Sequence, residues 1–384
     1  MRLEFPKGFL WGAATSAHQV EGNNHNDWTE WELKNAERTS KESGGKYPPE
    51  NYISGRACDH YNRFREDFDI VKSLNHNAHR FSIEWSRIEP REGEWDEKEI
   101  EHYRQVIATL RERGIEPFVT LWHWTVPVWF RDKGGWLSKE STKYFKRYTE
   151  KIISSFPDIC FWITLNETNV YTGHGYWRGE WPPCKRSLRQ YLLANHHLSQ
   201  AHIAAYKAIK SANPKSKAGL AHNMIYFTKF PARLKNFIYN HFFLRSIKTY
   251  QDFIGVNYYF SDRKMAERSD MNWPIDPDGF YHVLKEAAKY GKPVYVTENG
   301  IADAEDKKRR KYIADHIAAM HKAIAEGIDV RGYLYWSLLD NFEWSSGFTP
   351  RFGLVEMNYK TMERHIRQSA YEYTKIIKEN ALEI

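Results

Sequence analysis

Two glutamates, Glu167 and Glu298, end short apolar segments that read TLNE and VTENG. Two carboxyl groups that face each other across a cleft can hydrolyse a glycosidic bond. One donates a proton to the leaving oxygen, while the other attacks the anomeric carbon or activates water. A separation of about 5 to 5.5 Å indicates retention of configuration through a covalent intermediate. The sequence leaves that separation open.

Aromatic residues make up 16% of the chain, with 15 Trp, 24 Tyr and 21 Phe. This content fits either a large aromatic core or a cleft in which rings stack on the apolar faces of sugars. Composition alone does not distinguish the two.

The chain contains no sequence motif of the other common enzyme classes. There is no HExxH, GxxxxGK[ST], GxSxG or GxGxxG pattern, so the metalloprotease, P-loop, hydrolase-elbow and dinucleotide-binding classes have no anchor. His196, His197 and His202 follow a helical pattern, and we interpret them as packing or surface residues rather than metal ligands. We therefore expect neither a metal nor a cofactor.

The three cysteines, Cys58, Cys160 and Cys184, are widely spaced and form no CxxC pair. This pattern predicts neither a disulfide framework nor a zinc site, and it fits a reducing compartment, so we expect a cytoplasmic protein. Cys160 lies in a predicted strand and is expected to be a buried thiol. Residues 1–17 resemble a signal peptide only superficially, because a glutamate and a proline interrupt them.

The formal net charge is +7 and is spread along the chain. The one dense basic block, KKRRK at 307–311, is interpreted as the solvated start of a helix rather than as a nucleic-acid patch. No run approaches the roughly 18 consecutive apolar residues that a membrane span needs. We expect neither nucleic acid nor membrane as a partner.

Eight short segments rich in β-branched and aromatic residues alternate with helical patterns. This order predicts an α/β protein with a single (β/α)8 TIM barrel over residues 1–384. The predicted strands are 8–14, 78–83, 116–122, 159–165, 217–222, 252–258, 293–297 and 330–336. The predicted helices are 59–75, 97–113, 139–155, 188–212, 233–249, 280–290, 306–326 and 362–379.

Active sites of this fold lie at the carboxyl ends of the strands and in the loops that follow them. A single Asn or Glu after a strand is most often a turn or N-cap residue. A whole ring of polar and aromatic residues in these positions predicts a site. The ring contains Gln19, Glu21, Glu84, His123, Trp124, Asn166, Glu167, Asn223, Asn257, Tyr259, Glu298, Asn299, Glu343 and Trp344.

At these positions the chain resembles glycoside hydrolase family one, the family of β-glucosidases and β-galactosidases. The resemblance covers nearly the whole chain, and its motifs in this order are far more specific than any one of them. They are FLWGAATS at 9–16, QVEG at 19–22, RFSIEWSR at 80–87, WSLLDNFEW at 336–344 and RFGL at 351–354.

The resemblance implies a role for each matching residue. Glu298 would be the nucleophile and Glu167 the acid/base, with Arg80, Tyr259 and Asn257 supporting Glu298. A cation and a hydroxyl donor favour a charged nucleophile, and a nearby carboxylate raises the pKa of the proton donor. The substrate-binding positions of the family correspond to Gln19, His123, Trp124, Asn166, Trp336, Glu343, Trp344 and Phe352, with Trp336 as the stacking floor.

Members that act on 6-phosphorylated sugars generally replace the Glu343-Trp344 pair, and a carboxylate there would repel phosphate. The resemblance therefore implies a retaining, exo-acting β-glycosidase that releases the non-reducing terminal sugar of non-phosphorylated β-glycosides. It would be β-glucosidase-like, with β-galactosidase or β-fucosidase side activity left open. It would bind a small-molecule β-glycoside or oligosaccharide as substrate. A homo-oligomer is possible, and the sequence does not decide it. A transglycosidase on the same site and a carbohydrate-binding barrel with little turnover are the alternatives.

The chain departs from the family pattern in two places. Thr168 follows the acid/base where the family usually has proline, which loosens a backbone constraint and adds a donor. The stretches 223–255 and 259–298 are shorter than usual, so the loops on the leaving-group side are expected to be trimmed. The aromatic residues of 226–243 in this trimmed region are interpreted as core packing, with an exposed partner patch as the alternative.

Overall fold

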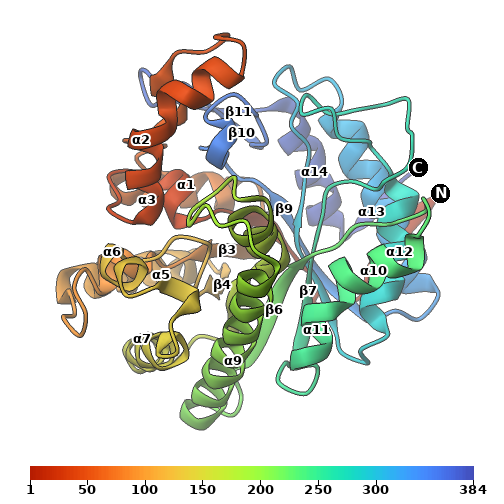
Figure 1. Cartoon of the computed structure of the whole chain (residues 1–384). Coiled ribbons are helices and arrows are strands. Elements are labelled where there is room, and N and C mark those ends of the chain that lie inside the picture. The colour runs from red at the N-terminus through yellow and green to blue at the C-terminus, as the bar shows by residue number, and fades with distance from the viewer.

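The computed structural model describes residues 1–384, and a closed barrel of eight parallel strands lies at its centre (Figure 1). The strands follow one another around the barrel in chain order, and the first pairs with the last. The (β/α)8 prediction is therefore confirmed. The strands are β2 (Leu10–Ala14), β3 (Ala78–Ser82), β4 (Glu116–Thr120), β5 (Phe161–Asn166), β6 (Lys217–Asn223), β7 (Phe253–Tyr258), β8 (Val294–Asn299) and β9 (Val330–Trp336).

Large apolar side chains fill the amino-terminal half of the barrel. Phe118 stacks on Phe161 with ring centroids 4.2 Å apart, and Phe253 and Tyr295 close the layer edge-on. Such a packed layer makes the barrel interior a core rather than a pore. The polar residues of the strands are thereby confined to the opposite, carboxyl end.

Helices surround the strands, and each predicted helix has a counterpart whose ends differ by a few residues (Figure 1). The helix after β9 starts later than expected, because 364–366 form a strand. The main ones are α3 (His60–Ser73), α5 (Glu97–Glu112), α7 (Ser141–Ser155), α9 (Leu188–Ala212), α12 (Pro277–Ala288), α13 (Arg309–Ala325) and α14 (Gln368–Glu379). The basic block at 307–311 begins α13, where Arg309 is buried and Lys307 and Arg310 are exposed.

Several elements had no clear sequence signal. The longest is α2 (Asp27–Glu42), which starts with a capping box formed by Asn26 and Thr29. The shorter helices are α1 (Ala17–Val20), η1 (Pro49–Tyr52), α4 (Trp85–Ile88), α6 (Val128–Asp132), η2 (Gly135–Leu137), α8 (Thr168–Thr172), η3 (Gly173–Arg178) and η5 (Trp344–Ser346). Outside the barrel, β1 (Arg2–Glu4) pairs with β12 (Ala381–Glu383), and β10 (Val355–Met357) pairs with β11 (Arg364–Ile366).

The predicted helix at 233–249 is divided into three parts. They are α10 (Ala232–Asn236), the π-helical turn η4 (Phe237–His241) and α11 (Phe242–Ile247). Phe243 is buried, whereas Phe230, Phe237 and Phe242 are exposed. The core-packing interpretation is therefore wrong for these three rings, because only α11 turns an apolar face to the barrel.

The three cysteines are free, and Cys58 is buried. Cys160 is exposed and lies just before β5, so the prediction of a buried thiol was wrong. None of the helices combines the length and the hydropathy that crossing a bilayer requires. The two termini lie side by side, because β1 pairs with β12 (Figure 1).

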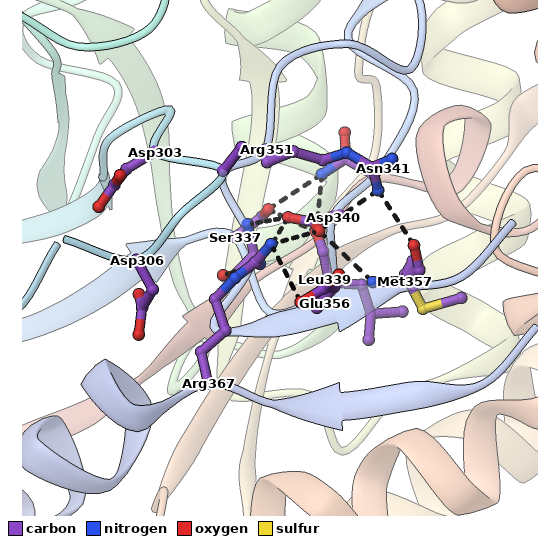
Figure 2. A network of polar contacts seen from close by, with 12 residues as sticks. Asp303, Asp306, Ser337, Leu339, Asp340, Asn341, Arg351, Glu356, Met357 and Arg367 are labelled. Atoms are coloured by element: carbon purple, nitrogen blue, oxygen red, sulfur yellow. Dashed lines mark hydrogen bonds and ion pairs between the residues drawn. The ribbon is translucent and has the colours of Figure 1, made fainter. Parts of the chain in front are cut away.

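A buried ion pair fixes the long loop that follows β9. Asp340 is fully buried and receives two hydrogen bonds from Arg367, at 2.8 and 2.9 Å. Arg351 approaches the same carboxylate at 3.4 Å, and the Gly353 amide donates to it at 2.8 Å (Figure 2). The loop carrying residues 337–344 is thereby tied to the β10–β11 hairpin and to the start of α14.

We expect Arg367→Ala to lower the free energy of unfolding by about 3–5 kcal/mol, because it leaves the buried Asp340 carboxylate without its main partner. The matched control is Arg331→Ala, which removes a pair with Asp329 whose side chains are 48% and 52% exposed. That pair is worth about 0.2–1 kcal/mol. Denaturant unfolding followed by fluorescence measures both variants. Equal losses in the two would contradict this account of the loop.

Candidate active site

Glu298, at the carboxyl end of β8, is held by a cation and a hydroxyl group. Arg80 on β3 donates from Nη1 to Glu298 Oε1 at 2.5 Å, and Tyr259 donates its hydroxyl hydrogen to Oε2 at 2.6 Å. Arg80 and Glu298 are both buried. Both contacts favour the charged form of Glu298.

Glu167 directly follows β5 and starts α8 with a left-handed backbone, at φ +43°. Such a conformation is uncommon for a residue with a side chain and is often found at functional sites. Two amides, from Asn223 and Asn257, donate to Glu167 Oε1 at 3.0 and 2.9 Å. Thr168 is fully buried, and its hydroxyl group has no hydrogen-bond partner.

The two carboxyl groups differ in their affinity for a proton. Burial and then the charge of Glu298 raise the pKa of Glu167 to about 8. Burial also raises the pKa of Glu298, but Arg80 and Tyr259 oppose that rise. A proton shared by the pair therefore resides on Glu167, and the negative charge resides on Glu298.

Asn166 and Asn257 lie between the two carboxyl groups. Asn166 accepts from Arg80 Nη2 at 2.6 Å, and its amide nitrogen lies 3.1 Å from His123 Nε2. Asn257, which we expected to support Glu298, donates to Glu167 and also helps to lower the pKa of Glu298. One network of hydrogen bonds thus spans the whole catalytic pair.

Aromatic rings form a wall beside this network. His123 lies parallel to both Trp336 and Trp344, with ring centroids 6.0 Å apart in each pair. Trp124 packs on Trp344 at 4.7 Å and donates to the Asn166 carbonyl at 3.0 Å. Rings held in this way present flat faces that suit the apolar side of a sugar.

Gln19 and Phe352 complete the surroundings. The Gln19 amide donates to Asn341 Oδ1 and to the Phe342 carbonyl, both at 2.9 Å, on the loop held by Asp340. Phe352 packs in one small cluster with Trp336 and lies against the Tyr259 ring. Three residues of the predicted strand-end ring are paired elsewhere: Glu21 with Arg87, Glu84 with Thr125, and Asn299 with Tyr312.

Glu343 receives a hydrogen bond from Trp336 Nε1 at 3.2 Å. Burial, together with the charges of Glu298 and Glu167, raises its pKa to about 8. Burial of Glu343 therefore favours its protonated form. The largest charge effects on Glu343 come from acidic residues, namely Glu298, Glu167 and Asp340.

Sequence reasoning placed Asn223 at a strand end but assigned it no role. It missed Thr120, which accepts from Arg80 Nε at 3.0 Å, and Tyr239, which donates to Asn223 Oδ1 at 2.9 Å. Thr120 closes a strand and could have been found by the same rule as its neighbours. Tyr239 lies in a helical pattern that gave no signal.

The raised pKa of Glu167 predicts a pH-dependent effect of Glu167→Gln on stability. Between the ordinary value of 4.5 and about 8, the folded protein keeps a proton that the unfolded chain loses, so the stability of the wild type falls as pH rises. The variant lacks this dependence. Its free energy of unfolding relative to wild type should rise by up to about 1.4 kcal/mol per pH unit over this interval.

Thermal or denaturant unfolding of wild type and Glu167→Gln at several pH values measures this difference. Glu37 is exposed and makes no hydrogen bond or ion pair, so Glu37→Gln serves as the control with a flat difference. A flat difference for Glu167→Gln as well would contradict the assignment of the proton.

Comparisons with known proteins agree with this geometry. The model of glycosyl hydrolase family 1 matches residues 1–238 and 260–382. β-Glucosidase A of Thermotoga maritima is 34% identical over 450 aligned positions, with 99% of each chain covered. A β-galactosidase of Sulfolobus acidocaldarius is 31% identical, with 99% of this chain and 96% of that protein covered.

Solved structures give the same result. A β-glycosidase from Pyrococcus horikoshii is 37% identical, with a TM-score of 0.92 over 100% of this chain and 97% of that one. The β-glucosidase from Thermotoga maritima in complex with castanospermine is 32% identical, with a TM-score of 0.88 over the whole of both chains. The chain therefore belongs to glycosyl hydrolase family 1, the enzymes that hydrolyse O-glycosyl bonds.

Proposed function

We propose that this enzyme is a retaining, exo-acting β-glycosidase, β-glucosidase-like, that releases the non-reducing terminal sugar of β-glycosides. The observation that carries this proposal is the unequal pair of carboxyl groups. Glu298 is paired with Arg80 and Tyr259, while Glu167 is enclosed and has a raised pKa. A charged nucleophile beside a neutral acid is what the retaining reaction needs.

In the first step a carboxylate oxygen of Glu298 attacks the anomeric carbon, and the bond to the leaving oxygen breaks. Glu167 gives its proton to that oxygen, so the aglycone leaves as a neutral alcohol. The sugar is then bound covalently to Glu298. In the second step Glu167, now a carboxylate, takes a proton from water, and the water oxygen displaces Glu298 from the sugar.

The wall of the site would bind the terminal sugar. Trp336 would provide a flat face, while Gln19, His123 and Glu343, which protein hydrogen bonds hold in place, would supply polar groups for the sugar hydroxyls. The Thermotoga maritima β-glucosidase has been solved with deoxynojirimycin and with glucoimidazole, which are sugar-like ligands of that protein. Because the relatives include both a β-glucosidase and a β-galactosidase, we propose glucosides as the main substrates, with galactosides or fucosides as side substrates.

The substrate would be non-phosphorylated. The charge of Glu298 acts on Glu343, so a phosphate group bound at this corner would be repelled by a nearby carboxylate.

We also propose that the aglycone of the substrate binds in a wide opening. The alignment with the Thermotoga maritima relative spans 450 positions, more than the 384 residues of this chain, so that relative carries additional segments. Residues 239–259 fall outside the match to the family model. An open entrance would admit large aglycones. It would also admit a sugar acceptor, and transfer to that acceptor is transglycosylation. Alternatively, a second subunit covers the entrance.

Replacing each carboxyl group by glycine, with azide added, tests the two roles. Glu298→Gly and Glu167→Gly should each lose at least three orders of magnitude in turnover of an aryl β-glucoside. Azide that fills the place of Glu298 attacks the opposite face of the sugar and gives an α-glycosyl azide. Azide at the place of Glu167 attacks the glycosyl-enzyme and gives a β-glycosyl azide when the leaving group is activated.

Nuclear magnetic resonance of the products distinguishes the two anomers. A β-glycosyl azide from Glu298→Gly and an α-glycosyl azide from Glu167→Gly would show that Glu167 is the nucleophile and Glu298 the acid/base. Sugar binding by a wild type that turns over no aryl glycoside would instead favour a carbohydrate-binding barrel. Disaccharide formation in the presence of added sugar, in preference to hydrolysis, would favour the transglycosidase.

A further inference from the structure

The acid/base carboxyl is held asymmetrically. Both amide donors, Asn223 Nδ2 and Asn257 Nδ2, point to Glu167 Oε1, while Oε2 makes no hydrogen bond within the protein. Two N–H groups occupy the two lone pairs of Oε1, so the lone pairs of Oε2 stay free for a proton. The protein thus distinguishes the two oxygens of one carboxyl group.

This distinction depends on which way each amide faces, because an asparagine side chain can present either nitrogen or oxygen. Each of the two amides has a hydroxyl group on its oxygen. Thr297 donates to Asn257 Oδ1 at 2.6 Å, and Tyr239 donates to Asn223 Oδ1 at 2.9 Å. A hydroxyl group that donates to the amide oxygen favours the orientation in which the amide nitrogen faces Glu167.

The backbone around Tyr239 is held in place by hydrogen bonds. It lies in the π-helical turn η4, and such turns are frequent at functional sites. Its carbonyl accepts from Asn169 Nδ2 at 3.3 Å, and His222 Nε2 lies 3.2 Å from it. The neighbouring Asn240 side chain pairs with both the amide and the carbonyl of Ile225, at 3.0 and 2.8 Å. The turn is therefore fixed to the end of β6 and to α8.

We propose that Tyr239 is a positioning residue for the acid/base. Its hydroxyl group fixes the Asn223 amide, so that both amides occupy Glu167 Oε1 and the transferable proton resides on Oε2. The assignment rests on the proposed retaining reaction. It gives the turn at 237–241 a part in catalysis, although Tyr239 does not touch Glu167 through a hydrogen bond.

Several other groups also influence Glu167 and are left unchanged by a substitution at 239. Glu298 raises its pKa, and Arg80 lowers it. Burial and the charge of Glu167 raise the pKa of Tyr239, so its phenol stays protonated and can donate. Further charged or titratable groups act on Glu167, Tyr239 or their partners; they include Arg178, Tyr191, His222, His241, Tyr259 and Glu343.

The test compares kcat/KM of Tyr239→Phe on two β-glucosides. A glucoside with an alkyl leaving group needs the proton of Glu167, whereas a 2,4-dinitrophenyl glucoside does not, because its leaving group departs as a stable anion. We expect a loss of about 3- to 12-fold on the alkyl glucoside, the equivalent of one hydrogen bond. On the dinitrophenyl glucoside we expect less than about a 2-fold change.

The pH profile gives a second readout. Without Tyr239 the Asn223 amide is no longer fixed, and Glu167 loses a steady N–H donor to its charged form. The basic limb of kcat/KM on the alkyl glucoside should therefore move to higher pH, by about 0.3 to 1 unit. A merely structural role would not move this limb.

Two controls accompany the test. Tyr226→Phe, in the same segment, removes a hydroxyl group that makes no hydrogen bond, and it should leave both substrates unchanged. The double variant Asn223→Ala/Tyr239→Phe should be no slower than Asn223→Ala alone, because Tyr239 acts through Asn223.

Equal losses on the two glucosides, an unmoved basic limb or a further loss in the double variant would each overturn the positioning role. A wild type that is inactive on both glucosides would overturn the proposed function, and this assignment with it. An active wild type with Tyr239→Phe unchanged on both would overturn this assignment alone.

Discussion

The interaction on which the site depends is the buried ion pair between Arg80 and Glu298. A buried guanidinium is costly unless every donor finds an acceptor. Here the acceptors come from three other strands: Thr120 on β4, Asn166 on β5, and the Thr297 carbonyl and Glu298 on β8. The barrel must therefore be closed and in register before this cation can be accommodated.

The division of labour between the two carboxyl groups follows from that ion pair. Arg80 and Tyr259 stabilise the negative charge on Glu298. Burial of Glu167 and that nearby negative charge raise the pKa of Glu167, so the proton resides on Glu167. The loop held by Asp340 and Arg367 brings Glu343 and Trp344 to the same mouth. Arg80 thus determines which carboxyl group is charged, while the buried pair of Asp340 and Arg367 positions the aromatic wall.

The eight strands and the strand-end residues could be predicted, because hydrophobic periodicity and barrel topology are local or repetitive signals. The break in the helix at 233–249, the role of Tyr239 and the proton on Glu343 could not. Each depends on what packs against a residue from far along the chain. Cys160 shows the same limit, since β5 begins two residues later than predicted and the thiol is exposed.

The most direct test of the central claim is a pH titration of the glutamate carboxyl groups by ¹³C nuclear magnetic resonance, in wild type, Glu167→Gln and Glu298→Gln. We predict two carboxyl groups with a pKa of about 8, Glu167 and Glu343, of which one disappears in Glu167→Gln. The pKa of Glu167 should fall in Glu298→Gln, because the like charge is gone, and that of Glu343 should fall with it. If both resonances survive in Glu167→Gln and one of them is lost in Glu298→Gln, the proton resides on Glu298 and the assigned roles are wrong.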